Sequence, residues 1–486
     1  MRSPSTSSSS SSSSSLFGQR DFRLLLAGQT TSQLGAQVSG VAIPLLAVAT
    51  LHASAFEVGL LGAASTIAFA VLGLPAGAWI DRVRRRPVLV ASDLVRAVLL
   101  ATIPLAWMLG VLSVWQLLVV SLLVGVARVF FDVGYRSYLP AVIGRDRVLA
   151  GNSSLEFVRA SGQVAGPALG GVLVAALGAA LVVLVQAVTF AVSAACLLGI
   201  RAREGRAGAA GAYVLPAQAE TEERAASVSD TDGLVPETEE IRRPETRESS
   251  LPRGHAEPAE GAASVSGTAG GGRRSRMGAD IAEGLRVVFH TRVLRATAVA
   301  SAVSNFAFAV ASAVNIVFLS RTLGLPPAVI GVVIAVGSVT VMIGAAFTTR
   351  LAGAVGSARI IWLSLAVTTP LSLATAFAQP GWWTLLVVVG IAAGELGQIV
   401  YAITNVSLRQ QIVPDRLLGR VNATMQVVVM GLFPLGAIIG GVLGEVIGAR
   451  WTVLAAGVLL LCCPILLGKA LRGARDVEDV VEVAAG

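Results

Sequence analysis

Charged side chains are scarce in this sequence. Only 14% of its 486 residues are Asp, Glu, Lys or Arg, whereas 54% are hydrophobic, and the mean hydropathy is +0.75. Ordinary soluble domains carry about 25% charged residues. This scarcity excludes a conventional water-soluble fold and indicates a chain whose main solvent is lipid.

Cysteine and histidine are rarer still. The three cysteines lie within apolar runs and the three histidines are scattered, so the sequence has neither a disulfide framework nor metal-ligand spacing. It also lacks a Walker-type glycine loop for ATP and any constellation of nucleophile, base and metal. We therefore expect a protein that is not an enzyme and that uses no cofactor or metal.

The formal net charge of +8 raises the question of a nucleic-acid partner. The arginines, however, occur in short segments between apolar runs and do not build one basic face. We read this charge as membrane topology and expect no nucleic-acid partner.

Apolar runs of about 20 residues recur along the chain, and each is long enough to cross a hydrocarbon core of about 30 Å. We predict an all-α membrane protein in which twelve transmembrane helices form two pseudo-symmetric six-helix halves. The predicted spans are 21–50, 56–80, 88–110, 114–140, 150–176 and 179–200, then 290–320, 327–350, 358–379, 382–411, 418–446 and 450–472.

The remaining segments are polar. Residues 1–16 form a serine-rich tail that we expect to be disordered, and residues 201–276, rich in Glu, Arg, Ser, Pro and Gly, predict a disordered linker. The two halves then extend over 17–200 and 277–475, and residues 476–486 form a second tail.

Arginine in short loops indicates the orientation, because such loops resist translocation. The even-numbered loops contain Arg82, Arg84 to Arg86, Arg145, Arg147, Arg350, Arg359, Arg416 and Arg420, and the odd-numbered loops only Arg321 and Arg450. Five tryptophans lie at the opposite ends of the spans, as an aromatic belt requires. We expect both termini and the linker to be cytoplasmic in a multi-pass protein of the cell membrane.

An internal repeat relates the halves. DRVLAGNSS at 146–154 is similar to DRLLGRVNAT at 415–424, and GGVLVAALGA at 170–179 to GGVLGEVIGA at 440–449. Parallel repeats of this kind bind substrate at the repeat interface, near the bilayer midplane.

The loop after the second span, GAWIDRVRRRPVL at 77–89, resembles the signature loop of the major facilitator superfamily. The matching residues are Gly77, Asp81, Arg82, Arg85 and Arg86, whereas Arg84 replaces the usual second glycine. The resemblance implies a gating loop that latches helices on the cytoplasmic side, its carboxylate meeting a helix N-terminus. The alternative is a plain topology signal of clustered arginines.

The fifth span contains GQVAGPALGG, which is similar to the glycine-proline motif of exporter members, mainly antiporters. The matching residues are Gly162, Gly166, Pro167, Gly170 and Gly171. The alternative is ordinary close packing of small residues, since the repeat counterpart with Gly436, Gly440 and Gly441 lacks the proline.

Two further stretches, RDFRLLLAGQTTSQLG and YLPAVIGRDRVLAGNSS, resemble the subfamily of siderophore and macrolide (multidrug) exporters. The resemblance covers nearly all of residues 17–475 except the linker. It implies the major facilitator fold and a monomer in which spans one, four, seven and ten line a central cavity.

Polar residues in these four spans are candidates for the cavity, since in lipid they must face protein or water. The candidate substrate-cavity residues are Gln29, Gln33, Gln37, Asn305, Asn315, Gln398 and Asn405. Hydrogen bonding between helices is the alternative role for such residues.

Ionisable residues in the spans give the candidates for proton coupling. Asp93 and Arg96, Arg128 and Asp132, and Glu156 and Arg159 have spacings that allow pairing along one helix, which makes structural ion pairs an alternative. Glu395 has no local partner, but the repeat places Arg128 opposite Gln398, one helical turn from Glu395, so an ion pair across the cavity is an alternative. A lone carboxylate in a span can take up and release a proton near neutral pH. We expect Glu395 and Asp132 to hold the proton and Arg128 to tune them.

The resulting hypothesis is a secondary transporter that exports a small molecule by proton antiport, with the proton gradient as its energy source. A proton-coupled importer of the same fold is an alternative. A membrane sensor that signals through residues 201–276 is another.

Overall fold

The computed structural model describes residues 18–80, 82–144, 147–202, 286, 288–413, 415–471, 473–476 and 479. Within these ranges the ordered elements are all helical, with no strand. The described residues belong to one compact unit, which comprises 1–207 and 276–486. The predicted tail at 1–16 lies outside the described residues, as does the linker from residue 203 onward.

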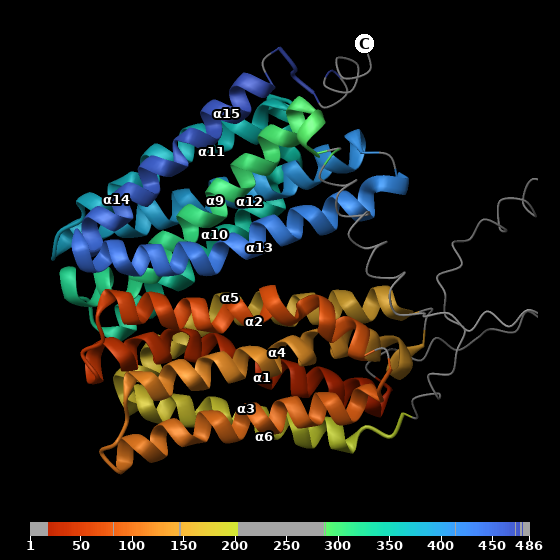
Figure 1. Ribbon diagram of the computed structural model, residues 1–486, viewed down its shortest axis with the longest axis vertical. Coiled ribbons are helices and arrows are strands. Elements are labelled where there is room, and N and C mark those ends of the chain that lie inside the picture. The colour runs from red at the N-terminus through yellow and green to blue at the C-terminus, as the bar shows by residue number, and fades with distance from the viewer. Residues whose placement is uncertain are drawn as a thin grey trace, which may run out of the picture. The chain divides into compact units, whose positions relative to one another are not determined.

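The first set of helices, coloured red to yellow in Figure 1, precedes the linker. It consists of α1 (Arg20–Leu45), α2 (Ala55–Ile80), α3 (Arg85–Met108), α4 (Val114–Ile143), α5 (Val148–Leu177) and α6 (Ala179–Gly199). A π-helical turn, Leu46–Thr50, extends α1.

The second set, coloured green to blue in Figure 1, follows the linker. It consists of α9 (Arg292–Val317), α10 (Pro327–Val355), α11 (Arg359–Leu373), α12 (Leu385–Ile412), α13 (Asp415–Val446), α14 (Ala449–Leu460) and α15 (Cys462–Ala470). A second π-helical turn, Phe318–Thr322, extends α9, just as Leu46–Thr50 extends α1.

The helices fall where the apolar runs predict them. Eleven helical segments in the described residues are long and apolar enough to cross a membrane, and α14 with α15 forms one of them. The remaining predicted span, 418–446, corresponds to α13, whose apolar described portion is shorter, Gly431–Val446. The all-helical membrane fold is therefore confirmed, while the twelfth crossing stays a prediction.

Local signals set the helix ends. Ser113 caps α4 by accepting a hydrogen bond from the backbone N–H of Gln116 at 3.3 Å, and Ser54 and Glu57 form a reciprocal capping box before α2. Gly178 stops α5 with φ +83°, a conformation that glycine adopts without steric cost. Short connections of this kind force consecutive helices to run back alongside one another.

Hydrophobic packing divides the bundle into two ends. One large core cluster draws on both sets, with Val41, Leu100 and Phe190 from the first set and Val314 and Ile330 from the second. It lies at the end opposite the arginine-rich loops, which we call the apolar end.

At the other end, which we call the basic end, the two sets have separate clusters. Phe22, Leu89 and Tyr138 belong to a cluster made only by the first set, and Leu408 and Cys463 to one made only by the second. Among the described residues, the two sets therefore share a large core at the apolar end and have separate clusters at the basic end.

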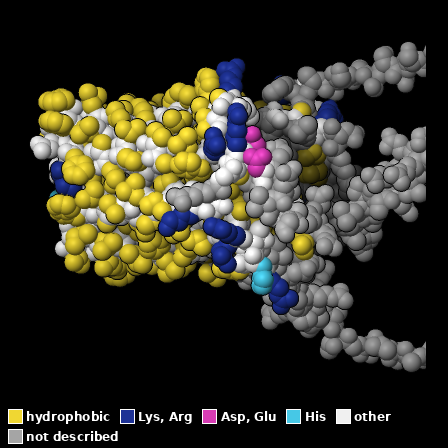
Figure 2. Space-filling view, turned by 90° about the horizontal axis from the view of Figure 1, so that it is seen from above, with side chains coloured by type: hydrophobic (Ala, Val, Ile, Leu, Met, Phe, Trp, Pro, Cys, Tyr) yellow, Lys and Arg dark blue, Asp and Glu magenta, His cyan; other side chains and the backbone are white. Residues whose placement is uncertain are grey.

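The outer surface suits a hydrocarbon environment. Large apolar side chains such as Val98, Leu105 and Val332 are at least half exposed, and Figure 2 shows apolar side chains over most of the visible face, with Lys and Arg gathered mainly towards one end. An exposed apolar surface of this extent is a feature of proteins that contact lipid.

Candidate functional site

The glycine-proline motif of α5 lies against α1. A Cβ atom at Gly170 would lie 2.7 Å from the carbonyl oxygen of Val38, and one at Gly162 would lie 3.9 Å from Gln33. Gly166 faces the side chain of Gln37. Only glycine permits the approach at Gly166 and Gly170, whereas Gly162 has room for a Cβ atom. The packing places two of the predicted cavity glutamines directly beneath the motif.

The end of the same motif contacts the second set. A Cβ atom at Gly171 would lie 2.8 Å from the Cα of Gly331 in α10, and Gly331 in turn approaches the carbonyl oxygen of Pro167. The α5 seam, which we define as Gly162, Gly166, Pro167, Gly170 and Gly171, therefore packs on α1 and joins α5 to α10.

A matching seam occurs on α13. We define the α13 seam as Gly436, Gly440, Gly441 and Gly444. A Cβ atom at Gly436 would lie 2.8 Å from the Cβ of Ala309 in α9, and one at Gly441 would lie 3.0 Å from the Cα of Phe56 in α2. The two seams related by the sequence repeat therefore make equivalent contacts, each with one helix of its own set and one helix of the other set.

Polar residues of α9 and α12 form a hydrogen-bonded network. Asn405 donates to the hydroxyl of Ser301 at 3.1 Å, and Ser301 lies 2.8 Å from the hydroxyl of Tyr401. The amide of Gln398 donates to the hydroxyl of Ser304. Both predicted cavity residues of α12 therefore link two helices, which is the alternative role that their residue type allowed.

Sequence reasoning did not single out Tyr401 and Ser304. Tyr401 is 4% exposed, and its hydroxyl also approaches the carbonyl oxygen of Thr297 at 3.3 Å. Its position between Gln398 and Asn405, at spacings of three and four residues, places all three on one helix face. That spacing is the signal that could have found it.

The other cavity candidates differ in their surroundings. Asn305 donates to the backbone carbonyl of Ser301 within α9 at 3.1 Å. Gln29 is buried at 6% exposure in α1, and Asn315 is partly buried near the apolar end of α9.

The three predicted ion pairs all form. Arg128 and Asp132 lie 3.4 Å apart on α4, with side chains 69% and 38% exposed, and Arg159 and Glu156 lie 2.7 Å apart on the exposed surface of α5. Their side chains are accessible, so the attraction within each pair is modest in water.

Asp93 and Arg96 form a buried pair on α3. The guanidinium of Arg96 lies between two aromatic rings, 4.4 Å from the centroid of Phe131 and 4.3 Å from that of Phe190. Asp132 and Arg128 also act electrostatically on Arg96. A charged group held by an ion pair and two cation–π contacts joins α3, α4 and α6.

Glu395 lies partly buried in α12. A Cβ atom at Gly337 of α10 would lie 3.4 Å from its Cγ, and its carboxylate makes no ion pair or hydrogen bond with any described residue. Arg128 pairs with Asp132 within α4, and the pairing of Arg128 with Glu395 that the repeat allowed does not form in this structure.

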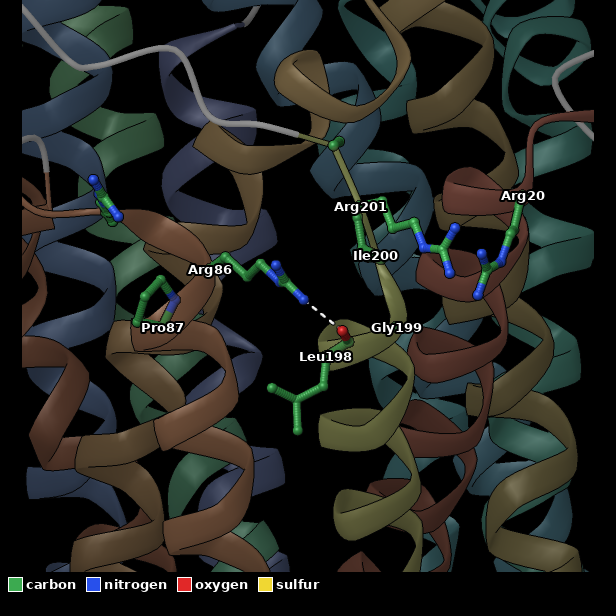
Figure 3. A pocket seen from close by; sticks show the side chains of 9 residues that line it. Arg20, Arg86, Pro87, Leu198, Gly199, Ile200 and Arg201 are labelled. Carbon is green, nitrogen blue, oxygen red and sulfur yellow. Dashed lines mark hydrogen bonds between the residues drawn. The ribbon is translucent and has the colours of Figure 1, made fainter.

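The predicted gating loop lies between α2 and α3. Gly77 is in the last turn of α2 and Arg82 is exposed, whereas Asp81 lies outside the described residues. Arg85 begins α3, and Arg86 donates to the carbonyl oxygen of Leu197 at 3.0 Å. Arg86 also donates to the carbonyl oxygen of Leu198 at 2.5 Å, the bond drawn in Figure 3. Arg86 thereby ties α3 to the C-terminal end of α6, where a cation is favoured.

The described residues contain no cluster of three or more His, Cys, Asp or Glu that could hold a metal ion. The cysteines at 196, 462 and 463 have free thiols. The part of the chain that the structure describes has eleven apolar helices of membrane length, an apolar outer surface and two repeated glycine seams. These features define a multi-pass membrane protein built from two related sets of helices.

Comparison with known sequences gives the family. The sequence profile described as Major Facilitator Superfamily matches residues 25–245 and 297–483, which together make up most of the chain. The protein belongs to the major facilitator superfamily and is a membrane transport protein, not an enzyme.

Two curated relatives are similar over one part of the chain. An uncharacterized MFS-type transporter, YfiS of Bacillus subtilis (strain 168), is 32% identical over 186 residues, 37% of this chain and 42% of the relative. The multidrug efflux pump Tap of Mycolicibacterium fortuitum is 34% identical over 161 residues, 32% of this chain and 39% of the pump. The matched segments thus span less than half of either relative, and the similarity to an efflux pump agrees with the exporter subfamily that the sequence resembles.

Solved structures share the fold. A mutant of the nucleoside transporter NupG has a TM-score of 0.64 at 11% identity, covering 93% of this chain and 100% of that one. A bacterial homologue of the iron transporter ferroportin, in an inward-facing state, has a TM-score of 0.64 at 15% identity, covering 93% and 99%. At these identities the likeness concerns the fold alone.

Proposed function

We propose that this protein exports a small molecule across the cell membrane by proton antiport, with alternating access between its two sets of helices. The observation that carries the proposal is the lone, partly buried carboxylate of Glu395 within α12. An ionisable residue in a span costs about 2.5–3.5 kcal/mol at the bilayer centre by insertion scales. Because the cost of the charged carboxylate depends on its surroundings, the carboxylate of a transporter can bind and release a proton as the surrounding helices move.

The packing of the two ends supports alternating access. The sets share a core at the apolar end and have separate cores at the basic end. Arg321 of the second set also donates to the carbonyl oxygen of Val48 in the first at 3.0 Å. With arginine-rich loops on the cytoplasmic side, as the positive-inside rule requires, this is the arrangement that is closed to the outside, and both termini are then cytoplasmic.

The N-terminal set supplies a second place for the proton. In our proposal Asp132 exchanges the proton with water through its 38% exposed side chain. Arg128 lies 3.4 Å from the same carboxylate and competes with the proton for it. The two carboxylates, Asp132 and Glu395, then give one proton-carrying group to each set.

Export is favoured over import by two features. The α5 seam has the proline that the exporter motif contains, and one relative that is similar over part of its length is named a multidrug efflux pump. We further propose that the substrate binds near the polar faces of α1 and α9, that the protein acts as a monomer without a cofactor, and that it has no nucleic-acid partner.

The first test measures accumulation of labelled antibiotics, dyes and siderophores in an efflux-deficient bacterium that expresses the protein. We expect cells that express the wild-type protein to accumulate less of these compounds than cells without it. A protonophore and the Glu395→Gln substitution should each abolish this reduction. The matched control is Glu445→Gln, the same chemical change at an exposed position of α13, which should transport normally. Full export by Glu395→Gln would contradict the coupling role of this carboxylate.

The same experiment distinguishes the importer alternative. Higher accumulation with the wild-type protein would reverse the direction, and the α5 seam would then have a packing role only. A sensor that signals through the linker is tested by deleting residues 205–272, since transport should survive this deletion whereas signalling should vanish.

A further inference from the structure

A cavity of about 760 Å³ opens at the basic end of the first set, between the ends of α1, α3 and α6. Four arginines line it: Arg20 from the start of α1, Arg84 and Arg86 from the start of α3, and Arg201 just after α6. Figure 3 shows the guanidinium groups of Arg20 and Arg201 on one side of this cavity and Arg86 on the other.

The positive charge of this cavity is weakly compensated. The side chains of Arg20, Arg84 and Arg201 make no ion pair or hydrogen bond with another described residue. The one carboxylate described close by, Asp21, accepts from the backbone N–H of Arg201, with both oxygens at 3.2 Å. Three of the four guanidinium groups that line the cavity therefore have no counter-ion among the described residues.

The first turn of α3 adds to the positive potential. Its backbone begins at Arg85, directly beside two of the arginines, and free N–H groups at a helix start favour anions. Phosphate and carboxylate groups match the planar donors of arginine better than any other ligands do. The chemistry of the cavity is that of a phosphate-binding site.

A second cavity, of about 420 Å³, continues from the first along α3. Arg86, Pro87 and Leu198 line both cavities, and Val90, Ala91 and Leu94 line the second alone. Leu94 is 45% exposed and Leu198 59% exposed, on the apolar outer surface of α3 and α6. The polar cavity thus opens into an apolar groove that faces the lipid.

We propose that this pair of cavities is a binding site for an anionic phospholipid of the leaflet at the basic end. The phosphate of the headgroup lies among Arg20, Arg84 and Arg201, and one acyl chain lies in the groove beside Ala91 and Leu94. A soluble phosphate compound would use the arginines but would leave the groove empty, and the continuity of the two cavities favours the lipid.

This site is separate from the proposed transport path. It contains none of the polar residues assigned to the substrate or the proton, and it touches the gating loop only through Arg84 and Arg86. A bound lipid would hold the starts of α1 and α3 and the end of α6 together, in the same place where Arg86 already joins α3 to α6. The inference stands whether or not the protein is a proton antiporter.

The test is native mass spectrometry of the full-length protein with phosphatidylglycerol and with phosphatidylcholine of the same acyl chains. We expect phosphatidylglycerol to bind in preference. The triple variant Arg20→Gln, Arg84→Gln, Arg201→Gln should weaken phosphatidylglycerol binding on the order of 100-fold, since one arginine near a lipid surface contributes about fivefold. Ala91→Trp, which fills the groove, should weaken it as well.

The matched control removes three exposed arginines at the basic end of the second set: Arg350→Gln, Arg359→Gln and Arg475→Gln. This control should bind phosphatidylglycerol as the wild type does. If the first triple variant fails to fold, the single variant Arg84→Gln serves instead, with an expected loss of about fivefold.

Three results would overturn the proposal. The first is equal binding of the two lipids, and the second is an equal loss in both triple variants. The third is displacement of phosphatidylglycerol by inorganic phosphate together with normal binding in Ala91→Trp, which would make the cavity a site for a soluble anion.

Discussion

The α5 seam and the α13 seam solve the same packing problem with different residues. Each seam packs against one helix of its own set and one helix of the other set, so closely at several positions that only glycine fits. In α5, however, the third member of the series is Pro167, and Gln33 and Gln37 of α1 lie beneath the seam, whereas in α13 the corresponding residue is Ala437.

The helices beneath the two seams show the same contrast. Under the α13 seam, α9 presents Asn305 at the place of Gln33, but Ala309 at the place of Gln37. Close approach therefore does not require proline at the place of Pro167, because α13 has Ala437 there, its own Pro434 lies three residues earlier, and an alanine lies beneath. Proline at this place and the extra glutamine occur on the α5 side only, and we attribute them to transport rather than to packing.

The largest effect is expected when the proline is moved to the other seam. Ala437→Pro places proline in the interior of α13 at a residue 2% exposed, which removes a backbone hydrogen bond and costs about 3 kcal/mol or more. The reverse change, Pro167→Ala, should leave stability nearly unchanged but impair export. Thermal unfolding in detergent, combined with the accumulation assay, measures both. Equal unfolding midpoints for the two variants would contradict the distinction between the seams.

Adding a single methyl group to each seam gives the next largest effect. Gly171→Ala should destabilise the shared contact at the apolar end by about 1–3 kcal/mol, and more than Gly441→Ala. The reason is that its Cβ would lie 2.8 Å from Gly331, against 3.0 Å from Phe56 at Gly441.

Spin labels at Leu181 and Trp382, one exposed residue in each set, report the separation of the sets by pulsed electron resonance in a cysteine-free background. Gly171→Ala should populate longer distances than Gly441→Ala. An unchanged distance distribution in both variants would show that the seams do not control this contact.

A smaller effect is expected from the arginines at the apolar end. Arg321→Gln removes the hydrogen bond to Val48 that joins the sets, with a loss of about 1 kcal/mol for an exposed charged donor. Arg450→Gln is the matched control, since Arg450 donates to Ala378 at 2.9 Å within the second set. The same labels should register a change of about fivefold in the ratio of closed to open populations for Arg321→Gln only. A comparable change in Arg450→Gln would mean that charge, and not the contact between the sets, is responsible.

The smallest change in stability is expected at the glutamine under the α5 seam. Gln37→Ala gives α1 the residue that α9 has at the corresponding place, so we expect a loss of less than about 1 kcal/mol together with a clear drop in export. The unfolding midpoint and the accumulation assay are compared in the same variant. Normal export would assign Gln37 to packing alone.

Much of the fold could be predicted from sequence. A bilayer leaves no water to satisfy free backbone groups, so apolar runs of membrane length are helices, and their limits agree with the observed helices to within a few residues along most of the chain. The polar first half of α13 is the place where composition alone does not establish a crossing.

The candidate site could be predicted only in part. The spacing of polar residues gave the helices and the faces on which Gln398 and Asn405 lie, and the spacing of charged residues gave all three local ion pairs. It missed Tyr401 and Ser304, which complete the network between α9 and α12. Helical periodicity identifies a face but not the residue opposite to it, because that depends on the rotation and register of the neighbouring helix.

The sequence by itself determined that this is a membrane protein, that its two halves are repeats and that its loop arginines lie at one end. Each of these conclusions follows from local composition and spacing. Only the tertiary structure decided that Gly171 meets Gly331, that the large core shared by the two sets lies at the apolar end, and that four arginines from three helices line one cavity. The physical reason is that contacts between distant segments depend on how whole helices pack, and residues far apart in the chain have no shared local signal before they are brought together.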